Sequence, residues 1–106
     1  MAEQRSEFDE LARVLRDFAE ARDWGKFHNP KNLAMALAGE AGELLAEFQW
    51  LTPEQSSAAA LSSEQREAIA MEIADVQIYM IRLADVLGVN IPDAVRRKVE
   101  INEQRF

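Results

Sequence analysis

The segment LAMALAGEAGELLA, Leu33–Ala46, predicts a buried central helix, because only Glu40 and Glu43 interrupt its uncharged residues. At about 100° per residue of helix, Glu40 shares a stripe with Leu33 and Leu37. The opposite side of this helix is apolar as well, so the helix lacks a solvent face and is expected to lie inside a bundle. An ionised carboxylate in such surroundings is costly unless a cation or hydrogen-bond donors satisfy it. The two glutamates therefore require a partner.

A second stretch, AIAMEIADVQIYMI or Ala68–Ile81, has the same construction, with Glu72 and Asp75 as its only charges. Because 28 residues separate Glu43 from Glu72, the chain can reverse and return as an antiparallel helix. The ExxE and ExxD carboxylates would then converge and repel one another, which favours a hard divalent cation between them. Ligation by oxygen alone suits Mg²⁺, with Mn²⁺ as a substitute.

Both motifs resemble the metal-binding signature of the all-α nucleoside triphosphate pyrophosphatases of the MazG superfamily, and more narrowly the dCTP pyrophosphatase branch. One departure is that Gly39 precedes Glu40, whereas many members begin the motif with two adjacent glutamates. The resemblance implies a four-helix MazG-like bundle, completed by homo-oligomerisation, with residues 1–106 as a single domain. The segments that carry it are GEAGELLAEFQW (39–50), EIADVQIYMIRLAD (72–85), ARDWGKFHNPKNLAMAL (21–37) and KVEINEQRF (98–106).

Length and composition restrict the function further. A chain of 106 residues buries only about 60 to 70% of the surface it exposes when unfolded, so we expect a homo-oligomer, a dimer or a tetramer. The net charge of −7 disfavours nucleic acid polymers and anionic membranes as partners. The absence of cysteine excludes thiol catalysis and suits a reducing cytoplasm. The charged segment MAEQRSEFDE lacks the apolar core of an export signal, so a cytoplasmic location is expected.

Periodicity and capping signals predict the helices around these motifs. A first amphipathic helix begins after Ser6 and ends near Arg22, and its mixed-charge face is expected to be solvated. The helix that opens at Asn29-Pro30 is predicted to continue to about Leu51, where Thr52-Pro53 ends it. The third helix runs from a cap near Ser62 to Leu87, with Gly88 as its stop. A last helix is predicted over Asp93–Gln104.

Candidate substrate contacts come from aromatic and polar residues outside the carboxylate motifs. Trp24 and His28 lie in the short connection DWGKFHN, which either folds back as a plug of the core or forms a pocket wall that stacks a nucleobase. For Tyr79, core packing and substrate contact remain alternatives. Trp50 could serve the core, an oligomer contact or base stacking, and only the resemblance favours stacking.

The last helix carries the basic cluster Arg96-Arg97-Lys98 in an otherwise acidic protein. Lys98 and Asn102 are four positions apart and share a helix face. A surface basic patch is the simpler interpretation. The resemblance implies instead that this Lys-x-x-x-Asn pair meets the phosphates and the nucleotide.

The hypothesis that follows is a Mg²⁺-dependent nucleoside triphosphate pyrophosphohydrolase. The catalytic and metal-binding candidates are Glu40, Glu43, Glu72 and Asp75, with water attacking the α-phosphorus to give a monophosphate and pyrophosphate. The resemblance favours dCTP or a related or modified deoxynucleotide. Two alternatives remain: a non-catalytic helical interaction module with a structural cation, and an enzyme of the same fold that acts on another base, such as dUTP.

Overall fold

The computed structural model describes residues 6–106, which form α-helices, one short 3₁₀ helix and connecting turns, with no strand in that range. The expected all-α fold is confirmed. Residues 1–5, which belong to the charged segment considered above, lie outside the described residues. The helices are α1 (Glu7–Ala21), η1 (Gly25–Phe27), α2 (Pro30–Ala46), α3 (Ser63–Leu87) and α4 (Ile91–Arg105).

Side-chain caps set the helix starts. Ser6 and Ser62 each form a capping box with the residue three positions on, and Asn29 caps α2 through its side-chain oxygen. At the end of α3, Gly88 adopts a left-handed conformation with φ of 70°, as the predicted glycine stop requires. The predicted start of α4 at Asp93 is wrong by two residues, because Asn90 is the cap.

The predicted end of α2 at Leu51 is also wrong, since the helix ends at Ala46. Glu47 and Phe48 donate their backbone N–H groups to carbonyls three residues back, at 3.2 Å and 2.9 Å. These bonds mix with one of α-helical spacing, from Gln49 N–H to Leu45 O at 2.9 Å, so the regular helix ends before Pro53 is reached. Trp50 therefore lies in a turn beyond the helix.

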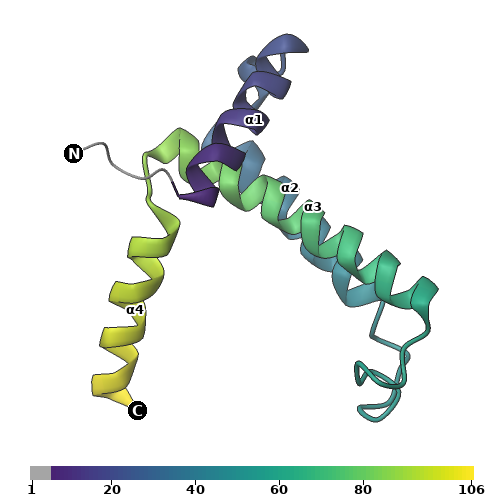
Figure 1. The fold of residues 1–106 in the computed structure, drawn as a ribbon. Coiled ribbons are helices and arrows are strands. Elements are labelled where there is room, and N and C mark those ends of the chain that lie inside the picture. The colour runs from purple at the N-terminus through teal and green to yellow at the C-terminus, as the bar shows by residue number, and fades with distance from the viewer. Residues whose placement is uncertain (1–5) are drawn as a thin grey trace.

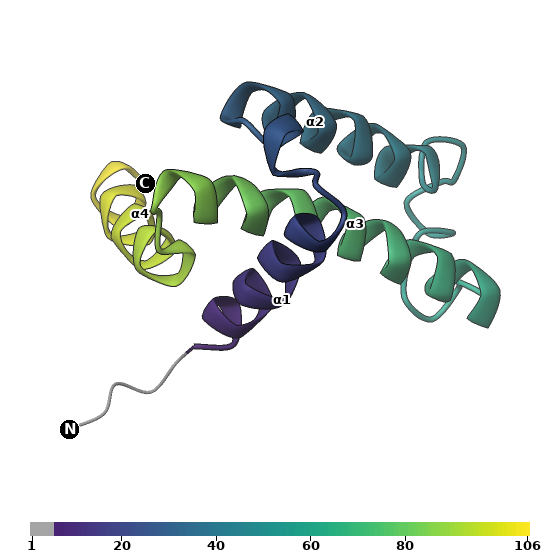
Figure 2. The same cartoon turned by 90° about the horizontal axis from the view of Figure 1, so that it is seen from above.

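The helices α2 and α3 lie side by side along most of α2 and make the most extensive helix contact of the described chain (Figures 1 and 2). Leu33 of α2 is 1% exposed, and Ile69 and Ile81 of α3 are buried with it. The residues from Glu47 to Ser62 connect the two helices at their far end. This pairing holds both carboxylate motifs on rigid helices.

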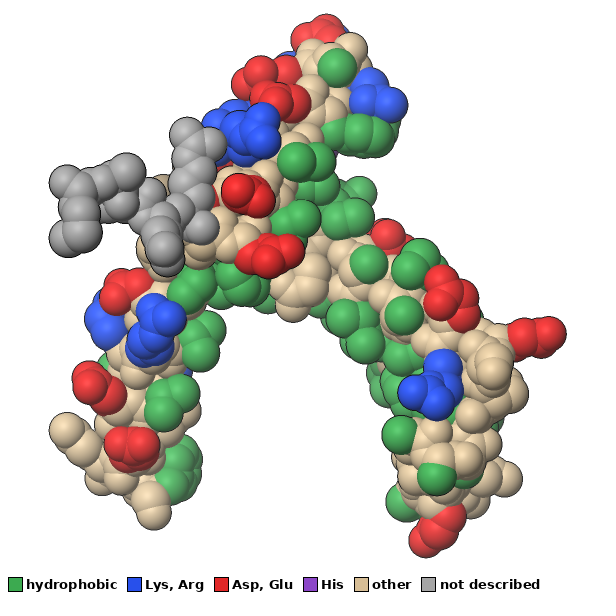
Figure 3. Space-filling view, in the orientation of Figure 1, with side chains coloured by type: hydrophobic (Ala, Val, Ile, Leu, Met, Phe, Trp, Pro, Cys, Tyr) green, Lys and Arg blue, Asp and Glu red, His purple; other side chains and the backbone are tan. Residues whose placement is uncertain are grey.

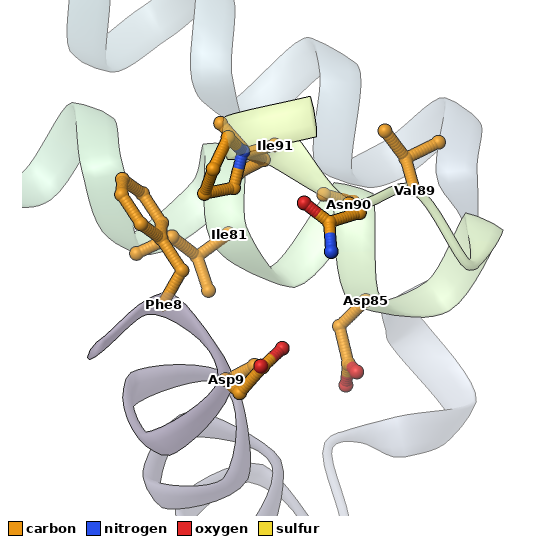
Figure 4. Close-up of a pocket in the computed structure, with 10 residues that line it drawn as sticks. Phe8, Asp9, Ile81, Asp85, Val89, Asn90 and Ile91 are labelled. Atoms are coloured by element: carbon orange, nitrogen blue, oxygen red, sulfur yellow. The ribbon is translucent and has the colours of Figure 1, made fainter. Parts of the chain in front are cut away.

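The first helix packs across α3 and is joined to it by an ion pair that the sequence did not predict. Arg16 belongs to the mixed-charge face of the first helix, which the sequence predicts to be solvated, but its Nη2 donates to Asp85 Oδ1 at 2.8 Å and its Nε to Oδ2 at 3.0 Å. Figure 4 shows Asp85 beside the start of α1, where α1, α3 and the beginning of α4 meet. The two-point contact fixes the crossing of α1 over α3.

The last helix projects away from the α2 and α3 pair, so one chain does not close a four-helix bundle (Figure 1). The Cα radius of gyration is 16.6 Å, against about 13 Å for a compact domain of this length. The exposed area of 8277 Å² exceeds the roughly 6,000 Å² expected for a compact 12.0 kDa protein. Figure 3 shows hydrophobic side chains on the facing sides of α4 and the α2 and α3 pair. Completion of the bundle by further copies remains a prediction.

Among the described residues, no helix combines the length and the apolar character needed to cross a membrane.

Candidate functional site

Three carboxylates meet where α2 and α3 run side by side. Glu40 of α2 and Glu72 and Asp75 of α3 each offer an oxygen, and these oxygens lie within 4.8 Å of one another. All three side chains are half-buried. The helix spacing explains this grouping, because Glu72 and Asp75 are one turn apart on α3 and face the same neighbouring helix.

Glu43 stands apart from this group. It is exposed, one turn further along α2 than Glu40, and it does not belong to the set of oxygens within 4.8 Å. It is nevertheless close enough to act on Glu72, whose pKa it helps to raise. Glu47, which the sequence did not single out, contributes to the same field from the end of α2.

Glu72 is the electrostatic centre of the carboxylate group. Its Oε2 atom is buried and has no hydrogen-bond partner within the described part of the chain. Loss of hydration raises the pKa of Glu72 above its ordinary value, and the negative charges of Asp75 and Glu40 raise it further. A buried carboxylate oxygen without a donor, surrounded by like charge, is suited to a cation.

The donor set indicates which cation would fit. Glu40, Glu72 and Asp75 offer only carboxylate oxygens, which hard divalent ions such as Mg²⁺ and Mn²⁺ prefer over softer metals. Because α2 and α3 each contribute, a bound cation would also relieve repulsion between the two helices. These residues therefore fit a hard divalent cation.

A separate pocket of about 170 Å³ lies between α1, the connection after it and α3. Trp24, His28 and Tyr79, three of the residues proposed from sequence to contact the substrate, all line it. Its other walls are mostly apolar, and they come from Leu15, Phe18, Ala19, Ile78 and Arg82. The pocket has the aromatic lining and the few polar groups that suit a planar ring.

The connection that carries Trp24 is held by local contacts. Asp23 adopts a left-handed conformation with φ of 56°, and its carboxylate pairs with Lys26 Nζ at 2.9 Å. The Trp24 ring meets the Phe18 ring edge-on, with 5.6 Å between centroids. These contacts set Trp24 against α1, so the connection forms a pocket wall.

The three other substrate candidates lie away from this pocket in one chain. Trp50 is 87% exposed in the turn beyond α2. Lys98 lines an apolar groove between the end of α3 and α4, while Asn102 lies a turn further along α4. Figure 1 shows α4 directed away from α2, so the protomer does not bring the α4 residues Lys98 and Asn102 to the carboxylates.

Sequence reasoning missed Arg82, which is 7% exposed and lines the Trp24 pocket. Its Nε donates to His28 Nδ1 at 3.2 Å. A signal was present, because Arg82 is the one charged residue in the run from Val76 to Leu83. A charge in such a run on a packed helix indicates a specific partner.

Comparisons with known proteins indicate the family of this chain. Residues 36–106 match the MazG-like family. The dCTP pyrophosphatase 1 of Homo sapiens is 41% identical over 98 residues, which cover 92% of this chain and 58% of that protein. The Bos taurus protein of the same name is 40% identical over 98 residues, with the same coverage. The chain thus spans little more than half the length of these curated relatives.

A solved structure covers the chain more completely. A pyrophosphatase from Archaeoglobus fulgidus superposes with a TM-score of 0.87 and 38% identity, over 100% of this chain and 97% of that one. The sequence match and the structural match therefore support the same family. The chain belongs to the MazG-like family.

Proposed function

We propose that this protein is a divalent-cation-dependent nucleoside triphosphate pyrophosphohydrolase whose substrate is dCTP or a closely related deoxynucleotide. The observation that carries the proposal is the group of Glu40, Glu72 and Asp75 oxygens within 4.8 Å of one another, in which Glu72 Oε2 has no hydrogen-bond partner from residues 6–106. The names of the relatives, dCTP pyrophosphatase 1 and a pyrophosphatase, support the reaction type.

In this proposal Glu40, Glu72 and Asp75 hold the cation, and Glu43 joins them from the next turn of α2. Mg²⁺, when bound, supplies positive charge that neutralises the triphosphate and polarises the attacked phosphoryl group. The four carboxylates supply little hydrogen-bond donation of their own, so they cannot bind a triphosphate directly. Their part is to place the phosphate chain at the junction of α2 and α3.

Hydrolysis of the α,β-phosphoanhydride needs a base for the attacking water. A carboxylate oxygen of this group that is not engaged with the cation accepts that proton as the water oxygen bonds to the α-phosphorus. The bond from the α-phosphorus to the bridging oxygen breaks, and pyrophosphate leaves. The products are a nucleoside monophosphate and pyrophosphate.

The pocket lined by Trp24, His28 and Tyr79 receives the nucleobase. Aromatic side chains stack on bases of any kind, while His28 and Tyr79 offer polar atoms that can distinguish one base edge from another. The volume of about 170 Å³ suits a single ring better than a large ligand. A pyrimidine such as cytosine fits both the size and the lining.

The active assembly is a homo-oligomer, a dimer or a tetramer. An apolar groove of about 340 Å³ runs between the end of α3 and α4 and includes Met80, Leu87 and Val95. Covering it with a second copy would bury exposed hydrophobic surface. The same assembly would give Trp50, Lys98 and Asn102, which stand away from the pocket in one chain, a place near the substrate.

A screen of nucleoside triphosphates with detection of pyrophosphate, with and without Mg²⁺, tests the proposal. We expect Mg²⁺-dependent release of pyrophosphate from dCTP. If only a triphosphate with another base, such as uracil, is hydrolysed, the proposed reaction type stands and the proposed substrate is wrong. No turnover with any triphosphate would favour a non-catalytic helical module with a structural cation.

A further inference from the structure

A buried positive charge stands beside the nucleobase pocket and plays no part in holding the cation. The Arg82 side chain is 8% exposed and makes two contacts of different kinds. Its Nε donates to His28 Nδ1 at 3.2 Å, and its Nη1 donates to Asp85 Oδ2 at 3.3 Å. A guanidinium with so little solvent is stable only if such partners hold it.

Asp85 connects this contact to the surface. Its carboxylate also accepts two hydrogen bonds from Arg16, at 2.8 Å and 3.0 Å. The hydrogen bonds from Arg16 hold the pKa of Asp85 below its ordinary value, so the carboxylate stays charged opposite Arg82. The result is a continuous chain of contacts from exposed Arg16 through Asp85 and Arg82 to His28.

This chain determines where the imidazole carries its proton. A guanidinium has five N–H groups and no acceptor, so His28 Nδ1 must present a lone pair to Arg82. The proton of the neutral ring is therefore on Nε2. Burial of the ring, together with the nearby charge of Arg82, lowers the pKa of His28.

The other charged and titratable groups around His28 do not oppose this arrangement. Tyr79 shares the pocket from α3. From α1, Arg22 lies over the Phe18 ring, with its guanidinium carbon 3.5 Å from the ring centroid. Within the connection, Lys26 is engaged by Asp23 at 2.9 Å. The carboxylate next in this chain of contacts, Asp85, reaches His28 only through Arg82.

The geometry points to Arg82 as a positioning residue that fixes His28 as a neutral Nε2–H donor in the Trp24 pocket, while Asp85 and Arg16 hold Arg82 in place. This step rests on the proposed function. The hydrogen bond from His28 Nε2 is accepted by an atom on the edge of the nucleobase. Bases with a donor at that position would leave the Nε2–H group unpaired and bind less well.

The state of His28 can be observed directly, because the chain contains one histidine. Long-range ¹H–¹⁵N NMR spectra of the metal-free, nucleotide-free protein, recorded from pH 8 to 5, report both the protonated nitrogen and its pKa. We expect the Nε2–H form and a pKa below 6.5. In Arg82→Met, which keeps a long apolar side chain, the two neutral forms should mix and the pKa should rise.

Arg13→Met is the matched control, because among the described residues Arg13 forms an ion pair only with exposed Asp17, at 3.9 Å, and it does not line the Trp24 pocket. It should leave the His28 signals unchanged. An Nδ1–H ring in the wild type would overturn the inference, and so would an Arg82→Met spectrum identical to that of the wild type. If Arg82→Met fails to fold, Asp85→Asn, which loosens Arg82, should shift the same signals in the same direction.

Turnover then links His28 to the substrate. Arg82→Met should raise KM for dCTP by roughly 3- to 10-fold, the size of one lost hydrogen bond, with kcat changed less. The ratio of the variant KM to the wild-type KM should be largest near pH 8 and should shrink as the pH falls toward 6, because a protonated imidazole carries N–H groups on both nitrogens and again donates from Nε2. A loss of stability without these changes would mean that Arg82 is only structural. A wild type that lacks turnover while its His28 is Nε2–H would reject the proposed function but not the chain of contacts.

Discussion

Glu40 on α2 and Glu72 on α3 bring carboxylate oxygens within 4.8 Å of each other across the helix pair, and Glu72 Oε2 has no hydrogen-bond partner among the described residues. In the metal-free protein this approach of like charges opposes the packing of α2 on α3. With a cation between them, the same carboxylates would join the two helices. Stability and activity should therefore respond in opposite directions when one charge is removed.

Glu40→Gln should abolish most activity while the metal-free protein keeps or gains stability, because the amide removes repulsion at nearly constant volume. Mg²⁺ at a hundredfold excess over its Kd should stabilise the wild type by about 2.7 kcal/mol and the variant much less. Thermal melts in EDTA and in Mg²⁺, at one protomer concentration, measure both effects.

Glu67→Gln serves as the control for this experiment, because Glu67 is exposed on the same helix as Glu72 and outside the carboxylate group. It should change neither activity nor the response to Mg²⁺. A Glu40→Gln variant strongly destabilised in EDTA, beside a wild type indifferent to Mg²⁺, would mean that these carboxylates hold the fold and not a metal.

Trp24→Leu should raise KM for dCTP more than it lowers kcat. The loss of base stacking costs roughly 1 to 3 kcal/mol, which corresponds to about 5- to 150-fold in KM. Steady-state kinetics measure the change. Phe27→Leu is the control, because Phe27 is 58% exposed and does not line the pocket. Equal effects of the two substitutions on KM would mean that the nucleobase does not bind in this pocket.

Light scattering at micromolar concentration should show a dimer or a tetramer, because the chain exposes roughly 2,000 Å² more surface than a compact protein of its mass. Leu87→Glu, in the groove between α3 and α4, should shift the assembly toward smaller species. Gln104→Glu adds the same charge at an exposed position of α4 and should not. A monomeric, well-folded wild type would contradict the prediction.

Acidification should destabilise the protein through His28. Its pKa is lowered in the folded state, so below about 6.5 the unfolded chain binds a proton that the folded chain does not. The contribution of His28 to the free energy of unfolding is fully present above pH 6.5, and it is lost as the pH falls toward the pKa of His28 in the folded protein. Asp85, whose pKa is also lowered, adds a loss of the same sign below 3.8.

The raised pKa of Glu72 acts in the opposite sense, because stability is lost as the pH rises above 4.5. The pH profile of one protein therefore contains the contributions of all three groups. The difference between the wild type and His28→Gln isolates the histidine. Thermal melts of both proteins between pH 8 and 5 should converge as the pH falls. Parallel curves would indicate that burial and Arg82 do not depress the pKa of His28.

Local signals in the sequence were sufficient for most helix limits. Ser62 and Gly88 specify the ends of α3 by hydrogen bonding and backbone conformation, which depend on a few neighbouring residues. The end of α2 was misjudged because the tightening after Ala46 precedes the proline that was expected to stop the helix. Periodicity also placed Glu40 and Glu72 on packed faces, although it could not give the separation that leaves Glu43 outside the tight group.

Contacts between residues far apart in the sequence cannot be predicted from capping signals and periodicity. The pair formed by Arg16 and Asp85 joins residues 69 positions apart, and it depends on how α1 crosses α3. The direction of α4 likewise depends on packing that one chain does not complete, so the placement of Lys98 near the phosphates stays a prediction.

Hydrolysis of dCTP in ¹⁸O-labelled water with Mg²⁺, followed by mass spectrometry of both products, tests the proposed reaction most directly. Attack of water at the α-phosphorus predicts one ¹⁸O atom in dCMP and none in pyrophosphate. The label in pyrophosphate, or release of orthophosphate and dCDP, would place the attack at another phosphorus and contradict the proposed role of the Glu40, Glu72 and Asp75 site.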